Sequence, residues 1–193
     1  MVILSKSMKV LMLSTDKKIW HSKSAVRERM REYSALVEEL HVFIFGKANN
    51  SNIIDGQLFL YPINSRNIWA LFIFLFKSSG VIHRRQLSKS DTIVDSQDPF
   101  ELGLMALLLK IFYGFKLQMQ IHVDFFNPHF RNERRRFNLQ YFLAKILLRH
   151  ANKIRVVSKR VREYLVNQMG FDFKKIDYLP ILFNVDYGFN KKI

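Results

Sequence analysis

The stretch DTIVDSQDPFELGLMALLLK, residues 91–110, gives the clearest indication of the fold. It opens with a short apolar run at 91–95, turns through polar residues, and continues as an apolar run long enough for a helix. Pro99 suits a first helical position, where its fixed φ is favourable and its missing N–H is not needed. Gly114 is a natural stop for the helix. The stretch therefore predicts a buried strand, a turn and a helix.

The same alternation extends outward in both directions. The strands read as continuous apolar runs, which is typical of a parallel sheet covered on both faces. The sequence thus predicts an α/β fold, a Rossmann-like doubly wound parallel sheet of about six or seven strands with helices on both faces. Further strands are expected at 9–14, 41–45, 58–61, 116–123, 153–158 and 175–179, and further helices from Ser24 and at 67–76, 137–150 and 159–169.

Residues 9–14 should form the central strand, because the chain order reverses around the first strand in such folds. Pro62 should end the third strand, and Ser79 and Gly80 should end or interrupt the helix that begins at residue 67. The polar segment 46–56 should be a loop. We expect one domain over residues 9–186, preceded by a leader at 1–8 and followed by the start of a linker or tail at 187–193.

The charge balance predicts an anionic partner. Lys and Arg number 31 against 16 Asp and Glu, which gives a formal net charge of +15. Such a surface attracts nucleic acid, an anionic bilayer or phosphorylated substrates, although it can also serve solubility alone. Cysteine is absent, which excludes disulfides and thiolate chemistry and fits a reducing cytoplasm. The apolar run 68–76 is too short to span a bilayer, so a cytoplasmic protein is expected, at most peripheral on the inner face of the membrane.

Candidate functional residues follow the predicted strands. The carboxyl ends of parallel strands meet at one rim of the sheet, where ligands bind. The residues expected at that rim are Ser14, Thr15, Asp16, Ser96, Gln97, Asp98, His122, Asp124 and Ser158.

Several stretches together resemble the N-terminal domain of GT-B glycosyltransferases of the family 4 type. They occur in the order and at the spacing typical of that family, and they extend over most of the chain. The stretches are KVLMLST (9–15), DTIVDSQDPFELGLMALLLK (91–110), KLQMQIHVDF (116–125), HANKIRVVSKRVREYLVNQMG (150–170) and KIDYLPILFNVD (175–186).

The resemblance implies transfer of a sugar from a nucleotide-sugar donor to an acceptor hydroxyl, with this domain holding an acceptor that could be lipid-linked. It implies that His122 lies beside the reacting sugar, where a neutral imidazole can hydrogen-bond a hydroxyl; the alternative is a surface or capping histidine. Thr15, Gln97, Asp98 and Asp124 are expected to contact the acceptor. Asp98 could act as general base, but a cap of the following helix is the favoured alternative.

Two departures from the family bear on the donor. The loop DKKIWHSKSA (16–25) has no glycine, so close backbone approach to phosphates is not expected and Lys23, with Ser158, would supply the contacts instead. The family's C-terminal, donor-binding domain does not begin before Ile193. We therefore expect no activity unless a donor domain or partner subunit is joined to this chain.

A basic, aromatic stretch predicts attachment to an anionic membrane surface. Arg131, Arg134, Arg135 and Arg136 would meet lipid phosphates while neighbouring aromatics enter the interface; the candidates are Phe125, Phe126 and Phe130. The alternative is a solvated basic face. Nucleic acid is disfavoured because no recognisable reader motif is present. The histidines lack metal-ligand spacing, so neither a metal nor a cofactor is expected. A non-catalytic Rossmann-like binding module and a basic nucleic-acid-associated protein remain as alternative functions.

Overall fold

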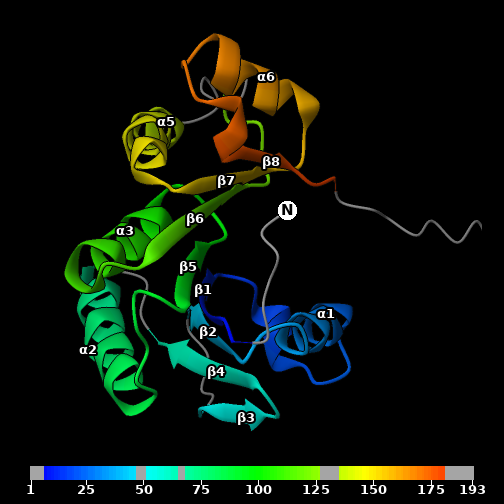
Figure 1. Ribbon diagram of the computed structural model, residues 1–193, viewed down its shortest axis with the longest axis vertical. Coiled ribbons are helices and arrows are strands. Elements are labelled where there is room, and N and C mark those ends of the chain that lie inside the picture. The colour runs from blue at the N-terminus through cyan, green and yellow to red at the C-terminus, as the bar shows by residue number, and fades with distance from the viewer. Residues whose placement is uncertain (1–6, 47–50, 65–67, 127–134, 181–193) are drawn as a thin grey trace, which may run out of the picture.

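The computed structural model describes residues 7–46, 51–64, 68–126 and 135–180. These residues form an eight-stranded sheet in the order β3-β4-β2-β1-β5-β6-β7-β8 (Figure 1). Every neighbouring pair is parallel except β3 with β4. The strands are β1 (Lys9–Ser14), β2 (Glu39–Phe45), β3 (Ile53–Asp55), β4 (Leu58–Ile63), β5 (Thr92–Ser96), β6 (Lys116–Ile121), β7 (Lys153–Val156) and β8 (Ile176–Tyr178). The predicted doubly wound α/β fold with a central first strand is confirmed.

The chain order reverses between β1 and β5. Strands β2 and β4 build the sheet outward on one side of β1, and β5 to β8 build it outward on the other. Right-handed crossovers then place α1 on one face and the later helices on the opposite face, as Figure 1 shows for α1 against α2, α3 and α5. The helices are α1 (Ala25–Ser34), α2 (Ile68–Arg84), α3 (Glu101–Tyr113), α5 (Arg135–Leu147) and α6 (Lys159–Asn167), with short 3-10 turns η1 (Lys17–Trp20), η2 (Leu148–His150) and η3 (Phe173–Lys175).

Each face of the sheet has its own hydrophobic core. On the α1 face, Met30 packs with Val42 and Leu60 in the smaller cluster. The larger cluster on the opposite face includes one or more fully buried side chains from each covering helix, among them Phe74, Leu109, Ala144 and Leu165. Both sides of the strands near β1 are therefore apolar, which explains their unbroken apolar runs.

The prediction that Pro62 ends the third strand is wrong, because β4 continues to Ile63. Pro62 is tolerated because β3 pairs with β4 only as far as Leu60. The carbonyl of Pro62 accepts a hydrogen bond from Lys77 Nζ at 2.7 Å instead of from a strand. The missing N–H of the proline thus costs no ladder hydrogen bond within the described sheet.

The prediction that Ser79 and Gly80 end the second helix is also wrong, because α2 runs on to Arg84. Beyond the glycine, Val81 and Ile82 are buried in the core. Their burial supplies the packing energy that overrides the weak helix propensity of glycine. The expectation that Pro99 is a first helical residue is also wrong, because α3 begins at Glu101 and the Phe100 before it is not helical.

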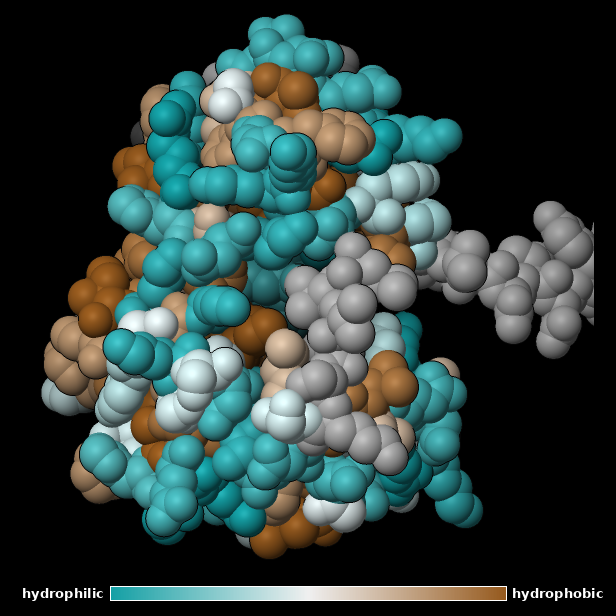
Figure 2. Space-filling model, in the orientation of Figure 1, coloured by the Kyte–Doolittle hydropathy of each residue, from teal (hydrophilic) through white to brown (hydrophobic). Residues whose placement is uncertain are grey.

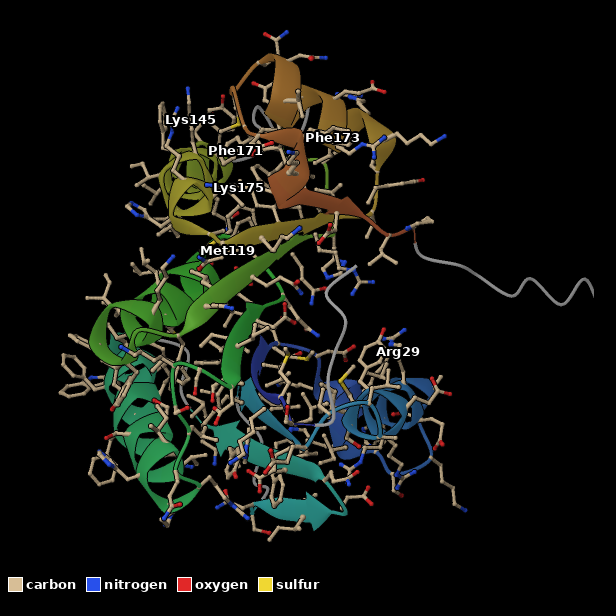
Figure 3. All side chains as sticks on the ribbon, in the orientation of Figure 1. Arg29, Met119, Lys145, Phe171, Phe173 and Lys175 are labelled. Atoms are coloured by element: carbon tan, nitrogen blue, oxygen red, sulfur yellow. The ribbon has the colours of Figure 1, made fainter. Side chains whose placement is uncertain are left out.

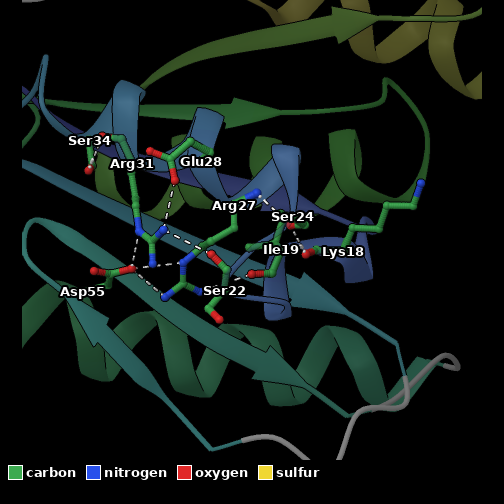
Figure 4. Close-up of polar contacts among 9 residues, drawn as sticks. All are labelled: Lys18, Ile19, Ser22, Ser24, Arg27, Glu28, Arg31, Ser34 and Asp55. Atoms are coloured by element: carbon green, nitrogen blue, oxygen red, sulfur yellow. Dashed lines mark hydrogen bonds and ion pairs between the residues drawn. The ribbon is translucent and has the colours of Figure 1, made fainter.

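Strand β3 lies in the segment for which a loop is predicted. It forms a hairpin with β4, and Gly56 takes a positive φ of 62° at the turn. Two arginines of α1 fix the hairpin through the carboxylate of Asp55 (Figure 4): Arg27 Nη2 and Arg31 Nε each donate to Oδ2 at 2.9 Å. The edge of the sheet is thus joined to α1 by charged groups, in addition to the packing of Ile53 against the smaller apolar cluster.

Candidate functional site

The carboxyl ends of four neighbouring strands meet at one rim of the sheet. The register aligns Leu13 of β1 with Ser96 of β5, and Ser96 with Met119 of β6. It also aligns Ile121 of β6 with Val156 of β7. The residues that follow these strands therefore lie in order along the rim: Thr15, Gln97, His122 and Ser158.

Gln97 is held against the end of β1. Its side-chain oxygen accepts a hydrogen bond from Ser14 Oγ at 2.5 Å, and its backbone N–H donates to the Leu13 carbonyl at 3.2 Å. Ser14 is fully buried, and its Oγ also accepts from the Asp16 N–H at 3.1 Å. This arrangement fixes the half-buried amide of Gln97 beside the exposed Thr15. Ser14 thus positions a rim residue.

Asp98 forms the turn that leads into α3. Its Oδ1 accepts a hydrogen bond from the Phe100 N–H at 2.8 Å, and its own carbonyl accepts from Ser96 Oγ at 2.5 Å. Burial raises the pKa of Asp98 to about 6, although the backbone hydrogen bond opposes the rise. The N-cap of α3 is Phe100 and receives no side-chain capping hydrogen bond, so the prediction that Asp98 caps the helix is wrong. The Asp98 carboxylate instead closes the turn that precedes the helix.

His122 directly follows β6 and is exposed. Partial burial of its ring lowers the pKa of His122 below the usual value, and the positive charges of Arg155 and Arg29 lower it further. Arg29 comes from α1 (Figure 3) and Arg155 from β7, so cations from two elements face the imidazole. The lowered pKa favours the neutral ring, which can both donate and accept one hydrogen bond.

The remaining predicted residues lie at or near the start of helices. Asp124 forms an ion pair with Arg160 Nε at 3.1 Å, near the N-terminus of α6. Ser158 is the N-cap of α6, and its side chain makes no capping hydrogen bond. Lys23 is exposed in the turn between η1 and α1. In this glycine-free segment Ile19 is fully buried and Ser24 Oγ caps α1 by accepting from the Arg27 N–H at 3.0 Å, so the loop folds on its own contacts.

The predicted membrane-facing aromatics are largely not on the surface. Phe125 and Phe126 are buried, which corrects the prediction for both. Phe126 stacks on Tyr164 of α6 with ring centroids 4.5 Å apart, and the two phenylalanines contact each other at 4.2 Å. They pack beneath α5 and α6 because burying contacting aromatic rings stabilises the fold more than leaving them in water. Phe130, Arg131 and Arg134 lie outside the described residues, as do the side chains of Arg135 and Arg136 on α5.

A polar cluster on the α1 face of β5, β6 and β7 was not among the predicted site residues. Asp95 is buried and accepts hydrogen bonds from Gln118 Nε2 at 2.9 Å and Gln120 Nε2 at 2.5 Å. Burial raises the pKa of Asp95, and these bonds oppose the rise. Arg155 Nη1 reaches Gln120 Oε1 at 3.4 Å, while its buried Nε has no hydrogen-bond partner within the described residues.

This cluster lines one side of a groove of about 290 Å³ whose other side is apolar, with Met12 of β1 and Tyr33 of α1. The sequence did carry a signal for it. Polar residues alternate with apolar ones at Asp95, Gln118 and Gln120, which is the period of a strand with one polar face. These strands nevertheless read as continuous apolar runs in the sequence, because the residues between the polar ones are apolar and face the other side of the sheet.

Comparison with known proteins agrees with this architecture. The chain resembles in fold a protein assigned as a UDP-N-acetylglucosamine 2-epimerase from Listeria monocytogenes, with a TM-score of 0.57, 13% identity, and coverage of 88% of this chain and 44% of that one. It also resembles a glycosyltransferase from Rickettsia africae, with a TM-score of 0.52, 12% identity, and coverage of 90% and 42%. The chain thus spans less than half the length of these solved structures. No curated protein sequence matches it.

The family comparison is more specific than the structural one. Structural similarity at 12–13% sequence identity shows only that the folds are alike. The profile of Glycosyltransferase Family 4, however, matches residues 26–186, from α1 to beyond β8. Because this match extends over most of the sequence, the chain belongs to glycosyltransferase family 4.

Proposed function

We propose that this chain is the acceptor-side half of a glycosyltransferase that moves a sugar from a nucleotide-sugar donor to an acceptor hydroxyl. One observation carries the proposal. A neutral imidazole, His122, follows β6 on the rim where Thr15 follows β1 and the fixed amide of Gln97 follows β5. The domain would comprise residues 9–186, with residues 187–193 as the start of a linker.

The rim residues offer groups that suit sugar hydroxyls. Hydroxyl groups donate and accept hydrogen bonds, and Thr15, Gln97 and His122 together present hydroxyl, amide and imidazole groups. A neutral imidazole binds a hydroxyl without attracting a competing anion. Asp124 would contribute through its free lone pairs while paired with Arg160. Asp98 is assigned to the turn, because its carboxylate already serves the Phe100 N–H.

A second domain or partner subunit would supply most of the donor site. The nucleotide sugar carries two phosphates, and on this chain the groups able to meet them are the ammonium of Lys23 and the N-terminus of α6 at Ser158. Lys23 is exposed and the Ser158 side chain makes no capping bond, so both are available. We infer that donor and acceptor meet between this rim and the other half, at the cytoplasmic face of a membrane if the acceptor is lipid-linked.

The test is a substitution in the assembled enzyme, made by joining this chain to the donor half of a family 4 glycosyltransferase. His122→Ala should lower the turnover number about 100-fold, which is the typical loss when a positioned proton donor or acceptor is removed. The free energy of unfolding should change by less than about 0.5 kcal/mol, because the residue is exposed. His83→Ala is the matched control, since His83 is an exposed histidine in the last turn of α2. Equal turnover of the two variants would rule out a role for His122 at the reacting centre.

A further inference from the structure

Three helices on one face of the sheet expose large apolar side chains to solvent. α3 packs between α2 and α5, so the outer sides of the three helices form one continuous surface. Figure 2 shows hydrophobic residues gathered along the side where these helices lie. We name this the apolar helix surface. Its residues are Trp69, Phe72 and Phe76 of α2, Leu104, Ile111 and Phe112 of α3, and Leu139, Phe142 and Ile146 of α5.

The exposed apolar residues of α2 follow a regular helical spacing. Trp69, Phe72 and Phe76 recur at intervals of three and four residues, which places them on one stripe of α2. Phe76 is 83% exposed, whereas Phe74, two residues away, is fully buried against the sheet. A helix that is apolar on its outer side as well as on its core side belongs in an apolar environment on both sides.

Exposed apolar side chains gathered on adjoining helices are a feature of binding surfaces. Contiguous apolar patches on soluble monomers rarely pass a few hundred Å², and larger ones mark sites that bind a protein or a membrane. Trp69 adds a further signal, because its amphipathic ring suits the boundary between water and lipid. Trp69 is 66% exposed and lies against Phe72, with ring centroids 6.0 Å apart.

The charges on these helices indicate what covers the surface. Neither α2 nor α5 contains an aspartate or a glutamate, and α3 contains only Glu101. Basic residues lie in the last turns of these helices and in the 3-10 turn that follows α5: Arg84, Lys110, Lys145 and Arg149. A second copy of this chain would bring its own formal charge of +15 against the same charge. An anionic bilayer complements both the apolar side chains and the cations of these last turns.

The direction of the helices relates this surface to the rim. In a parallel sheet the crossover helices run opposite to the strands, so α2, α3 and α5 begin at the rim that carries the candidate site. Trp69 and Leu104 lie in or next to the first turns of their helices. A bilayer against the helices would therefore approach the edge of the rim.

We infer that the apolar helix surface docks on an anionic lipid bilayer, with Trp69, Phe72 and Phe76 entering the interface and the cations of the last turns meeting lipid phosphates. This attachment uses helix faces rather than the segment around Arg131. It goes beyond the proposed function and requires no donor domain. A lipid-binding test on the isolated chain is therefore independent of sugar transfer.

The test is co-sedimentation of the full chain with vesicles of phosphatidylcholine alone or mixed with phosphatidylglycerol. Binding should require the anionic lipid and weaken several-fold between about 0.1 M and about 1 M salt, because screening shortens the range of the cations. Equal binding to neutral vesicles, or no binding to anionic vesicles at the lower salt, would overturn the inference.

Variants locate the docking surface. The triple change Trp69→Ser, Phe72→Ser and Phe76→Ser should lower the bound fraction at least ten-fold, whereas a control that removes exposed apolar residues elsewhere, Ile54→Ser with Phe173→Ser, should leave it unchanged. Circular dichroism checks that both variants fold. Equal losses in the two variants would contradict the assignment.

The fluorescence of Trp69 reports insertion directly. In a Trp20→Phe background, Trp69 is the only tryptophan, because the chain has two. Its emission should shift to the blue on anionic vesicles and be quenched by brominated acyl chains. Unquenched emission on anionic vesicles would overturn the inference. A dimer that the triple variant converts to a monomer would show instead that a second copy of the chain covers the surface.

Discussion

At the scale of single residues, His41 makes the stability of the protein depend on pH. It has no exposed surface in the middle of β2, where Nε2 lies 2.9 Å from Glu39 Oε2 and Nδ1 lies 3.1 Å from the Tyr61 hydroxyl. Burial lowers the pKa of His41 from 6.5 to about 4, although Glu39 opposes the change. The unfolded chain therefore takes up this proton at a higher pH than the folded protein.

The contribution of neutral His41 to the free energy of unfolding is fully present above pH 6.5 and is lost as the pH falls through about 4. This difference between the folded and unfolded pKa of His41 corresponds to roughly 3 kcal/mol in the free energy of unfolding. We expect urea unfolding to show this decrease between pH 7 and pH 4. In His41→Phe, which retains the stacking on Phe59, that part of the pH dependence should disappear. An unchanged pH profile in the variant would assign the loss to other groups.

The positions of rim residues were largely predictable from the sequence, whereas their contacts were not. Gln97 and His122 could be assigned to the rim because each follows an apolar run that ends in polar residues. The hydrogen bond between Ser14 and Gln97 joins residues 83 positions apart, and no local pattern encodes it. The burial of Phe126 likewise depends on Tyr164, a residue of a distant helix.

At the scale of elements, two glycines in helices should respond oppositely to alanine. Gly80 lies within α2, and a Cβ there would meet only the end of the Arg84 side chain, at 3.6 Å. Gly80→Ala should therefore raise the free energy of unfolding by about 0.5 to 1 kcal/mol, through helix propensity and a less flexible unfolded chain.

Gly103 is the contrasting position. A Cβ there would lie 3.2 Å from the Asp98 carbonyl oxygen and 3.5 Å from Leu147 Cδ1. Gly103→Ala should lower stability by about 1 to 3 kcal/mol, because α3 must move away from the turn before it. Thermal unfolding of the two variants measures the difference, and stabilisation by both substitutions would refute this account of the packing of α3.

The hairpin of β3 and β4 depends on a charged contact. Arg27 is 3% exposed, and two of its guanidinium nitrogens donate to Asp55. Asp55→Ala should lower the free energy of unfolding by about 3 kcal/mol, because the buried guanidinium of Arg27 loses its counterion. Glu28→Ala is the control. It removes an exposed partner of Arg31 and should cost less than about 1 kcal/mol in urea unfolding. Similar losses would mean that the Asp55 contact is no stronger than a surface ion pair.

Most of the strands and helices that contain an apolar run were placed correctly, although the end of α2 was not. β1, β5 and α3 agree with their predicted ranges to within two residues. The elements that differ depend on tertiary contacts. β3 has only three residues and is fixed by Asp55, and α2 passes Gly80 because the core covers the residues that follow. Local propensity cannot reveal either contact.

At the scale of the whole molecule, the two halves of the sheet are covered differently. α1 packs over β1, β2 and β4, while the groove lined by Asp95, Gln120 and Arg155 lies on the same face over β5, β6 and β7. The outer side of the opposite face carries the apolar helix surface. No helix in the described part of the chain has the length and hydropathy that crossing a bilayer requires. Apolar content alone could not distinguish core from surface here, because α2 is apolar on both sides.

In the proposed function, this chain supplies one half of a family 4 active site. The most direct measurement is release of nucleoside diphosphate from a panel of nucleotide sugars with candidate acceptors. It should be made on the purified 193-residue chain alone and on the same chain joined to the donor half of a family 4 enzyme. The chain alone should give only background release, whereas the joined protein should give release that depends on the acceptor. Robust sugar transfer by the chain alone would contradict the proposed function.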